Sequence, residues 1–573
     1  MPGALAERGI RVPPGLESVC IVAQELLSAY GRGVARCADG LLAGPSALRP
    51  AAGPEGPAAA AAQFAGRISA DELAVAGAGR FASLLRAGIA GMVVPADAPI
   101  YLATTAGAVD EMEAVVFAGA EFAGQGGFSQ LHELAAAAFG VAAERIQVVS
   151  SACASSTAAL ALAAGAIRRG ETECALVVGA DVVSEFVLAG FAALMASDPS
   201  GAHPFDADRK GVALGEACAA ALLMRADRAA REGRPCLGAV AGWSLTCDAN
   251  HLTGPSRDGA PLAEAICGAL DMAGAAPADV VTPCAHGTGT VYNDQMEMLA
   301  FRRVFGEQPR PTFSVKGGMG HVLGAAGLAE VLLTLEFLRR GRIPPTVGLR
   351  RAADDAAGWV SSEIRPVDSA GLAVSTNSGF GGTNAAVALT LAPRASSVIA
   401  AKTPPQRLGT ARVAAAEAAA TPEEAGSLPR NFSRFGPAVR RAYFAVRRAL
   451  AAAGLTADAG RIGLIADDRA GSERANWAYF ADYVNSGRTL ARGQMFAYTL
   501  PTAIAAECAI ACRLTGPLLS VADAVGSPRA AEQAARGLLA DGLCDAVVLL
   551  STDSAETRAA AWGPAESKPK ENP

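Results

Sequence analysis

A cysteine stands where a predicted strand meets a helix made mostly of small residues. Cys153 follows the apolar pair Val148 and Val149, and alanine and serine dominate the residues after it, up to Ile167. At the start of a helix, free backbone N–H groups and the helix dipole favour the thiolate form of a cysteine. We therefore expect Cys153 to be a nucleophile, with a buried structural thiol as the alternative.

Two of the five histidines lie in glycine-rich turns. His286 stands in the segment Ala-His-Gly-Thr-Gly-Thr, after an apolar run. His321 ends the segment Lys-Gly-Gly-Met-Gly-His, just before a helical stretch. Turns at element ends often bring side chains to a pocket, so a cysteine with two such histidines indicates nucleophilic catalysis, although a lone histidine is more often structural. The turn around His321 lacks the spacing of a phosphate-binding loop, so we expect no nucleotide site.

A third glycine-rich segment covers residues 375–384 and reads Ser-Thr-Asn-Ser-Gly-Phe-Gly-Gly-Thr-Asn. Glycines at this density let a backbone approach a substrate closely and direct N–H groups at it. The simpler alternative is a tight turn between two strands.

These segments need a scaffold, and the sequence indicates an α/β one. Short apolar runs at residues 19–23, 146–149, 174–179, 217–224 and 372–375 predict buried strands, and helical stretches separate them. The pattern breaks at residues 393–428, where prolines, alanines and threonines predict a linker. We expect a second folded segment at 429–560 and a flexible tail at 561–573.

The second folded segment repeats part of the first. An offset of 372 residues aligns Cys153 with Val525 and matches the order of strand, turn, small-residue helix, glycine and strand. Two unrelated βαβ units are the alternative. Because Val525 offers no nucleophilic atom and no histidine follows it, we expect this segment to be inert. Its apolar strands at 518–521 and 546–550 must be covered, so we expect it to pack against the rest of the chain or a partner subunit.

Composition excludes several classes of protein. The net charge is −6, charged residues make up 18% of the 573 residues, and no polybasic run occurs, which argues against nucleic acid or an anionic membrane surface as a partner. The long uncharged stretch at 150–167 predicts a buried helix rather than a membrane span. The twelve cysteines form no CxxC pair, so we expect reduced thiols in a cytoplasm and no structural metal.

Six ordered motifs together resemble the β-ketoacyl-acyl-carrier-protein synthases, the condensing enzymes of fatty-acid and polyketide synthesis. The resemblance covers about residues 18–392 and implies a thiolase fold. That fold has two related α/β halves in αβαβα layers, here 1–235 and 236–392, and is usually dimeric. The motifs lie at residues 151–156, at 204–216, at 248–253, at 286–297, at 316–330 and at 379–384.

The resemblance also implies roles. Cys153 corresponds to the nucleophile that takes an acyl chain from carrier-protein phosphopantetheine. His286 and His321 correspond to the pair that assists malonyl decarboxylation and stabilises the enolate oxygen, with Lys316 and Glu330 as their buried support. The backbone N–H of Cys153 and one from the Ser378–Gly379 turn would form the oxyanion hole. The family pattern further implies an oxyanion and gating loop of Ser378, Gly379 and Phe380, and substrate contacts from Thr253, Thr288 and Thr290.

No bound cofactor or metal is implied, because phosphopantetheine arrives on the acyl carrier protein. The expected partners are that carrier protein and a second ketosynthase-like subunit, in a homodimer or heterodimer. Segment 429–560 resembles the N-terminal half of a ketosynthase only. Two other functions stay open: an acyltransferase of the same fold that does not decarboxylate, and a non-catalytic partner resembling a chain-length factor.

One departure from the family pattern concerns the last loop. Ser378 stands where the family usually has a phenylalanine, which we expect to alter the gating of acyl chains.

Overall fold

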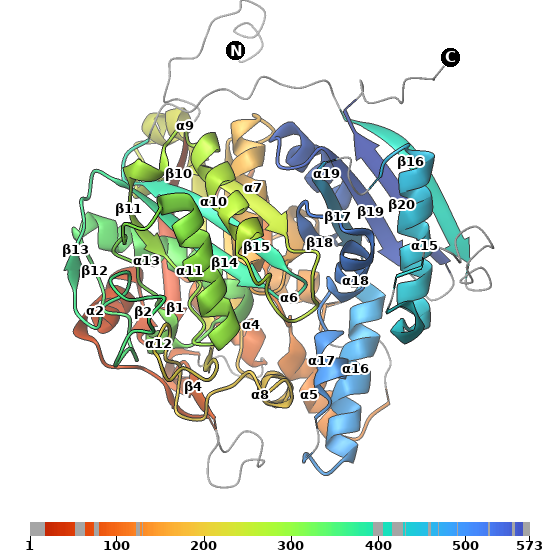
Figure 1. The fold of residues 1–573 in the computed structure, drawn as a ribbon, viewed down its shortest axis with the longest axis horizontal. Coiled ribbons are helices and arrows are strands. Elements are labelled where there is room, and N and C mark those ends of the chain that lie inside the picture. The colour runs from red at the N-terminus through yellow and green to blue at the C-terminus, as the bar shows by residue number, and fades with distance from the viewer. Residues whose placement is uncertain are drawn as a thin grey trace, which may run out of the picture.

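One mixed sheet runs through the whole chain (Figure 1). Its strand order is β11-β14-β15-β10-β1-β9-β7-β5-β6-β18-β17-β19-β20-β16. The computed structural model describes residues 18–51, 63–73, 79–121, 127–128, 130–393, 405–414, 428–429, 431–456, 460–467, 469–489, 491–524, 526, 528–552 and 556–564.

The first two parts of the chain contain the strands and helices expected of two α/β halves. The strands of the first half are β1 (Val19–Ser28), β5 (Ile100–Ala103), β6 (Ile146–Ser150), β7 (Cys174–Asp181) and β9 (Ala217–Arg225), with short β2 (Gly31–Arg32), β3 (Arg49–Pro50), β4 (Phe64–Gly66) and β8 (Leu214–Gly215). Its helices are α2 (Val34–Ala43), α4 (Arg80–Gly88), α5 (Val109–Phe117), α6 (Leu131–Phe139), α7 (Ser155–Arg168), α8 (Glu185–Ala193) and α9 (Ala226–Arg231).

The second half begins at β10, directly after the expected boundary at residue 235. Its strands are β10 (Gly238–Cys247), β11 (Val280–Cys284), β14 (Leu372–Gly379) and β15 (Thr383–Thr390), with short β12 (Arg342–Ile343) and β13 (Arg365–Pro366). Its helices are α10 (Ala260–Met272), α11 (Val291–Phe305), α12 (Lys316–Met319) and α13 (Ala326–Arg339).

The C-terminal segment adds a third set of elements. Its strands are β16 (Gln406–Ala414), β17 (Ile462–Asp467), β18 (Leu518–Asp523), β19 (Ala546–Thr552) and β20 (Glu556–Gly563). Its helices are α15 (Pro437–Ala452), α16 (Arg469–Asn485), α17 (Gly493–Ala497), α18 (Ala503–Cys512) and α19 (Arg529–Ala540).

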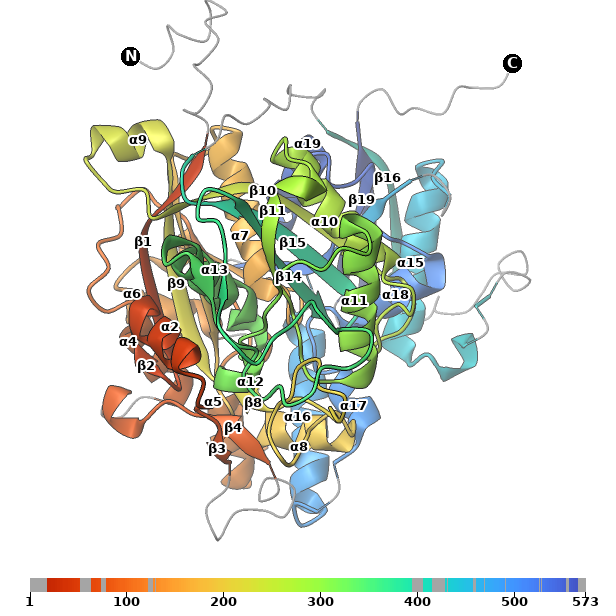
Figure 2. The same ribbon diagram turned by 60° about the vertical axis from the view of Figure 1, so that its left-hand side comes forward.

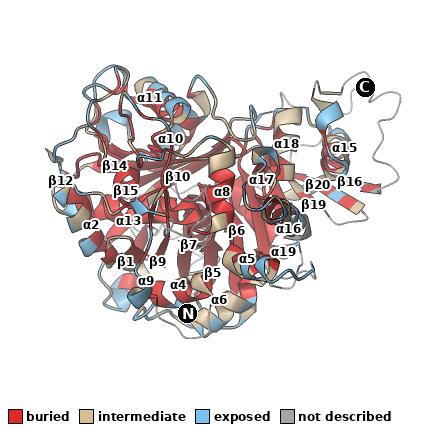
Figure 3. Ribbon diagram, turned by 90° about the horizontal axis from the view of Figure 1, so that it is seen from below, coloured by how far each residue is buried: buried red, intermediate tan, exposed pale blue. Residues whose placement is uncertain are grey.

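Helices α7 and α13 form the central layer of the first two halves. Both are buried along almost their whole length, because small and aliphatic residues surround each helix on every side. Alternate residues of the strands face this layer: in β15, Ala385, Val387 and Leu389 pack toward α7 and α13, whereas Ala386 and Ala388 face away. Figure 3 shows these inner elements buried and the exposed residues on the outer helices.

Outer helices complete the layers. Helices α4 and α6 cover the far face of the first half, and α10 and α11 cover that of the second, where Figure 2 shows them side by side. The sheet encloses α7 and α13, and its two parts are joined by the short pairing of β1 with β10. With the helices the two parts form five layers, α-β-α-β-α, so the predicted architecture is confirmed. Within the described residues, no helix is long and apolar enough to cross a membrane.

The C-terminal segment continues the sheet by pairing β18 antiparallel with β6. Val521 lies opposite Val149, which is its own counterpart in the predicted repeat. The repeat is also visible in the elements, since β18 and β19 each begin 372 residues after β6 and β7. The segment therefore packs against the synthase part of its own chain, which is one of the two places expected from the sequence; the other was a partner subunit. Val525 lies outside the described residues.

Two predicted boundaries are wrong in part. Residues 406–414 fall within the predicted linker but form β16, which pairs antiparallel with β20. Residues 561–563 fall within the predicted tail but belong to β20. In both places alanine, glycine and arginine dominate the strand, so the apolar run that indicates a strand is missing from the sequence. Residues 52–62, 415–427 and 565–573 lie outside the described residues.

The sheet face that α19 leaves open is polar rather than apolar. Trp562 is covered on this face by the guanidinium groups of Arg407 and Arg536, at 5.3 and 5.1 Å from its ring centroid. Arg412 and Arg558 follow on the same face, where they lie opposite each other in neighbouring strands. The segment thus avoids the exposed apolar patch that its strands alone would create.

A partly buried ion pair ties the two copies of the repeat together. Arg169 Nη1 lies 2.7 Å from Asp541 Oδ1, and their side chains are only 18% and 6% exposed. Burial raises the pKa of Asp541, whereas the nearby Arg169 lowers it. The charge of Asp541 therefore depends on Arg169 for compensation.

We predict that Arg169→Ala lowers the free energy of unfolding by about 2–4 kcal/mol at neutral pH, because it leaves a buried carboxylate unpaired. The loss should shrink as the pH falls through the raised pKa of Asp541, since protonation removes the buried charge. Thermal unfolding at several pH values measures this. The control is Arg36→Ala, which breaks an exposed ion pair with Glu72 and should change stability little; equal losses for both variants would contradict the prediction.

Candidate active site

The turn that carries Cys153 is held in a strained backbone conformation. Ala152, the residue before it, has φ of 49°, in the left-handed region that alanine rarely adopts. The Ala152 carbonyl accepts hydrogen bonds from Thr105 Oγ1 at 2.9 Å and Ser155 Oγ at 2.5 Å. These two hydroxyls therefore fix the direction in which the next residue, Cys153, presents its thiol.

Burial dominates the electrostatics of the thiol. Cys153 is 6% exposed, and burial raises its pKa to about 12, although the charge of Lys316 and the Phe380 N–H act to lower it. Helix α7 begins only at Ser155, so Cys153 precedes the first helical turn. The sequence-based argument for a thiolate at a helix start is thus outweighed by desolvation, and the thiol at rest is protonated.

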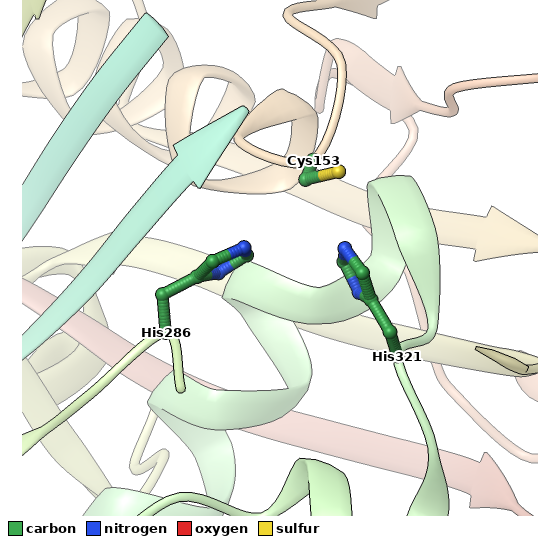
Figure 4. Close-up of side chains that lie close together, drawn as sticks. All are labelled: Cys153, His286 and His321. Atoms are coloured by element: carbon green, nitrogen blue, oxygen red, sulfur yellow. The ribbon is translucent and has the colours of Figure 1, made fainter. Parts of the chain in front are cut away.

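His286 and His321 meet at Cys153, although they come from different turns (Figure 4). His286 follows β11, and His321 follows α12. The Cys153 sulfur and a ring nitrogen of each histidine lie within 4.8 Å of one another. The two rings are 5.2 Å apart at an angle of 88°. The remaining histidines, His132, His203 and His251, make hydrogen bonds elsewhere.

Hydrogen-bond partners assign the tautomer of both rings. Lys316 Nζ lies 3.1 Å from His286 Nδ1, and the Leu323 backbone N–H donates to His321 Nδ1 at 3.3 Å. Ammonium and amide groups can only donate, so both Nδ1 atoms accept and both Nε2 atoms carry the hydrogen. Burial and the Lys316 charge hold the pKa of both histidines well below its usual range. The site therefore presents two neutral N–H donors.

A fully buried cation supports this arrangement. Lys316 forms an ion pair with Glu330 and also donates to the His286 carbonyl at 2.5 Å. Asn377 Nδ2 donates to the other oxygen of Glu330 at 2.7 Å. The Thr157 hydroxyl, from α7, donates to the side-chain oxygen Oδ1 of Asn377 at 2.5 Å. Because every charge has partners, the group can be buried without a large loss of stability.

Two further carboxylates shape the turns. Glu297 accepts hydrogen bonds from the backbone N–H groups of His286 and Gly287, each at 2.7 Å. Asp181 accepts from the backbone of Thr105, Ala106 and Gly324, at 2.7 to 3.0 Å. It thereby joins the turn beside Cys153 to the turn after His321. Sequence reasoning missed Asp181, although an acidic residue ending a fully buried strand is a signal that could have revealed it.

The three side chains open into a cavity of about 460 Å³. Thr253, Thr288 and Thr290 line it, so the structure brings all three predicted substrate contacts to the same space as Cys153. At its mouth lie the apolar side chains of Met195 and Tyr292, which are 88% and 64% exposed. The cavity is a route by which a long, thin substrate arm can reach the thiol from solvent.

The glycine-rich loop closes one wall of this cavity. A Cβ atom at Gly379 would lie 2.6 Å from Thr383 Oγ1 and 3.0 Å from the Cys153 nitrogen, so only glycine fits. The next residue, Phe380, directs its N–H at the Cys153 sulfur. The N–H of Phe380 thus comes from the turn between β14 and β15 and meets the turn between β6 and α7 that carries Cys153. The N–H that reaches the sulfur belongs to Phe380, next to the Ser378–Gly379 turn that was expected to supply it.

Phe380, rather than Ser378, is the aromatic side chain at this wall. Its ring stacks on Phe191 with centroids 5.8 Å apart. Ser378 is buried, and its hydroxyl donates to Asn384 Oδ1 at 2.9 Å. The structure thus assigns the shape of the wall to Phe380 and a hydrogen bond within the loop to Ser378.

Behind Phe380 lies a second, much smaller pocket of about 20 Å³. It touches Cys153 on one side, and Asn476, Phe496, Thr499 and Leu500 close it on the other. These four residues belong to the C-terminal segment, so this segment completes the surroundings of Cys153. From the sequence we expected this segment to pack against the rest of the chain or a partner subunit, but we assigned none of its residues to the site.

Cys153, His286 and His321 are also the only group of three within the described residues that is spaced closely enough to hold a metal ion. Thiolate and neutral imidazole are zinc ligands. However, the Lys316 ammonium already occupies the neighbourhood of His286 and would repel a second cation. The arrangement is better suited to donating hydrogen bonds to an anionic oxygen.

Two family models match the chain. The model of the β-ketoacyl synthase N-terminal domain matches residues 134–229 and again residues 388–563. The model of the β-ketoacyl synthase C-terminal domain matches residues 237–350. The second match to the N-terminal model agrees with the repeat seen in the strands.

Curated proteins and solved structures that resemble the chain are also ketosynthases. The 3-oxoacyl-[acyl-carrier-protein] synthase 2 of Mycobacterium bovis is 36% identical over 247 residues, which are 42% of this chain and 59% of that protein. The chain spans about 60% of the length of the curated relatives it matches. The structure of the ishigamide ketosynthase/chain length factor is 28% identical, with a TM-score of 0.59 over 65% of this chain and 98% of that one.

A second solved structure covers nearly the whole fold. The PfaC keto synthase-chain length factor has a TM-score of 0.74 over 96% of this chain and 79% of that one. At 16% identity, this likeness concerns the fold alone. It shows that the arrangement of the C-terminal segment beside the synthase part has a counterpart in a solved structure.

We predict that Lys316→Met, combined with Glu330→Gln so that no buried carboxylate is left unpaired, raises the pKa of both histidines. Because the Lys316 charge disfavours imidazolium, the acid limb of the pH–rate profile should move to higher pH by at least about one unit. The rate of malonyl-thioester decarboxylation against pH measures this shift. Lys210→Met removes an exposed lysine at the same cavity and is the control; an unmoved acid limb in the double variant would disprove the assignment.

We also predict that Phe380→Ala broadens the range of acyl chains that Cys153 accepts, since it joins the two pockets. Ser378→Ala should instead lower stability by about 1 kcal/mol, through the lost hydrogen bond to Asn384, and move the acyl range less. Acylation of Cys153 by thioesters of increasing chain length, followed by intact mass, measures both. A larger shift in acyl range for Ser378→Ala would return the gating role to Ser378.

Proposed function

The chain belongs to the β-ketoacyl synthase family, and we propose that it catalyses a decarboxylative Claisen condensation on an acyl carrier protein. In this proposal an acyl chain bound to Cys153 condenses with a malonyl unit, in a fatty-acid or polyketide type of synthesis. The observation that carries the proposal is the convergence of one thiol and two neutral imidazole N–H donors in a single cavity.

The first step transfers the acyl chain to the protein. The Cys153 sulfur attacks the thioester carbonyl carbon, and the phosphopantetheine sulfur leaves. The proton of the Cys153 thiol ends on the departing thiol, so the exchange consumes no proton overall. The N–H groups of Cys153 and Phe380 would stabilise the negative charge on the carbonyl oxygen, and the Lys316 charge favours the transient thiolate.

The second step uses the histidines. The bond between the malonyl carboxylate and its α-carbon breaks, CO₂ leaves, and the electron pair forms an enolate. The Nε2 hydrogens of His286 and His321 would stabilise the enolate oxygen, and the enolate carbon then attacks the thioester on Cys153. The Cys153 sulfur leaves with the electron pair of its bond and takes up a proton from solvent, so this step consumes one proton overall. Two neutral donors suit this step better than a charged base, because charge develops on the substrate oxygen.

The C-terminal segment would act in this scheme as a non-catalytic partner that completes the acyl pocket. It supplies Phe496 and Leu500 to the pocket and contributes no titratable side chain to the group around Cys153 in the described residues. The phosphopantetheine arm would enter past Met195 and Tyr292, and the carrier protein would dock around that mouth. Because β18 already occupies the edge of β6, any further subunit would use a different surface.

The expected cytoplasmic location also belongs to this proposal. It is supported by the twelve cysteines, all of which are free.

We predict that Cys153→Ala abolishes acylation and condensation, whereas His321→Ala lowers condensation at least about 100-fold with a smaller effect on acylation. The difference arises because the histidines stabilise the enolate rather than the thioester exchange. Incubation with acyl- and malonyl-carrier protein, followed by intact mass of protein and product, measures both steps. Cys236→Ala, which removes a half-buried cysteine far from the histidines in sequence, is the control. Transfer of an acyl chain to an amine or alcohol without loss of CO₂ would favour a non-decarboxylating acyltransferase instead.

A further inference from the structure

A second large cavity, which the proposed reaction does not use, measures about 750 Å³. It lies in the C-terminal segment, between α15, α16, α17 and α18, which gather on one side of the molecule in Figure 1. Its size is that of a pocket for a small organic ligand. No residue of the group around Cys153 lines it.

Four arginines from separate elements line this cavity, and no aspartate or glutamate is among its described lining residues. Arg492 forms an ion pair with Asp482 at 3.1 Å. Arg434 and Arg474 form neither an ion pair nor a side-chain hydrogen bond in the described structure, and both are exposed. The fourth is Arg441, on α15. The guanidinium groups of Arg434 and Arg474 can therefore bind a carboxylate or phosphate ligand through paired hydrogen bonds.

The opposite side of the cavity is apolar and buried. Val439 and Leu500 are 3% and 9% exposed, and Met495 and Ile504 are half-buried beside them. The arginines therefore stand at the solvent side and the hydrocarbon wall lies inside. This polarity fits an amphipathic anion whose head group stays at the surface and whose chain runs inward.

Leu500 connects this cavity with the site. The same side chain lines the arginine cavity and the small pocket that touches Cys153. A hydrocarbon chain in the arginine cavity would thus end against the wall of the acyl pocket, and a chain on Cys153 would have to displace Leu500 to reach the arginines.

We propose that the arginine cavity binds the anionic end of a long-chain carboxylate, with Arg434 and Arg474 holding the carboxylate and Met495, Ile504 and Leu500 packing on the chain. The ligand has two sources: a free fatty acid from solvent, or the far end of an acyl chain tethered to Cys153. The tethered source rests on the proposed function, whereas the free source does not.

The first experiment titrates the full-length protein with palmitate and with hexadecanol, after alkylation of Cys153 with iodoacetamide to separate the two pockets. Palmitate should bind with one site per chain and at least about 10-fold more tightly than hexadecanol. The double variant Arg434→Gln/Arg474→Gln should lose that difference. Arg558→Gln, an exposed arginine on β20 paired with Glu556, is the matched control and should keep it.

The second experiment follows acylation of Cys153 by intact mass, with palmitoyl-pantetheine and with the mono-pantetheine thioester of hexadecanedioic acid. A preference for the carboxylate-ended chain that is lost in the double variant and in Leu500→Trp would identify the tethered source. A palmitate site that depends on the arginines, without this preference, would identify the free source. Palmitate and hexadecanol binding equally, together with no preference between the thioesters, would overturn the proposal. If no acylation occurs at all, the proposed function fails, and the palmitate titration still decides the arginine cavity.

Discussion

The ammonium group of Lys316 is the constraint around which the site is organised. A cation buried to this degree must be compensated on all sides, and its partners are Glu330, the His286 carbonyl and His286 Nδ1. Those contacts fix the orientation of His286 and place its only N–H hydrogen on Nε2. They also keep both imidazoles neutral, which is the form that donates to an anionic oxygen. Removing a proton or a partner anywhere in this group would therefore affect the nucleophile, both histidines and the helix that carries Glu330.

Much of this could be predicted from the sequence, because it depends on local pattern. Buried strands such as β7 and β9 read as uninterrupted apolar runs, and the turns of His286 and His321 stand out through their glycines. What the sequence could not show depends on distances between remote residues. The protonated state of Cys153 follows from its burial, which overrides the effect of the helix end. Asp181 acts through backbone groups more than 70 residues away, from Thr105 to Gly324, and β16 lacks the apolar run that announces a strand.

The C-terminal segment shows how half of a fold can be kept stable without its other half. Its sheet is covered by α15 and α18 on one face and by α19 on part of the other. Beside α19, the side chains of Arg407 and Arg536 cover Trp562. Because it is part of the same chain, its pairing with β6 does not depend on protein concentration. The acyl pocket therefore has a permanent far wall, built from residues that carry no chemistry of their own.

The ion pair between Arg169 and Asp541 has a consequence for assembly, because the two residues are equivalent positions of the repeat. An association of two identical chains through β6 would obey twofold symmetry, and each residue near the axis would meet its own copy. Arg169 would then face a second Arg169, and two guanidinium groups would be desolvated together without a carboxylate between them. The C-terminal segment instead carries Asp541 at the position equivalent to Arg169. The edge of β6 is thus selective for the chain's own C-terminal segment. Two chains are therefore kept from pairing through β6 in two ways: β18 already covers this edge, and two Arg169 side chains would repel each other.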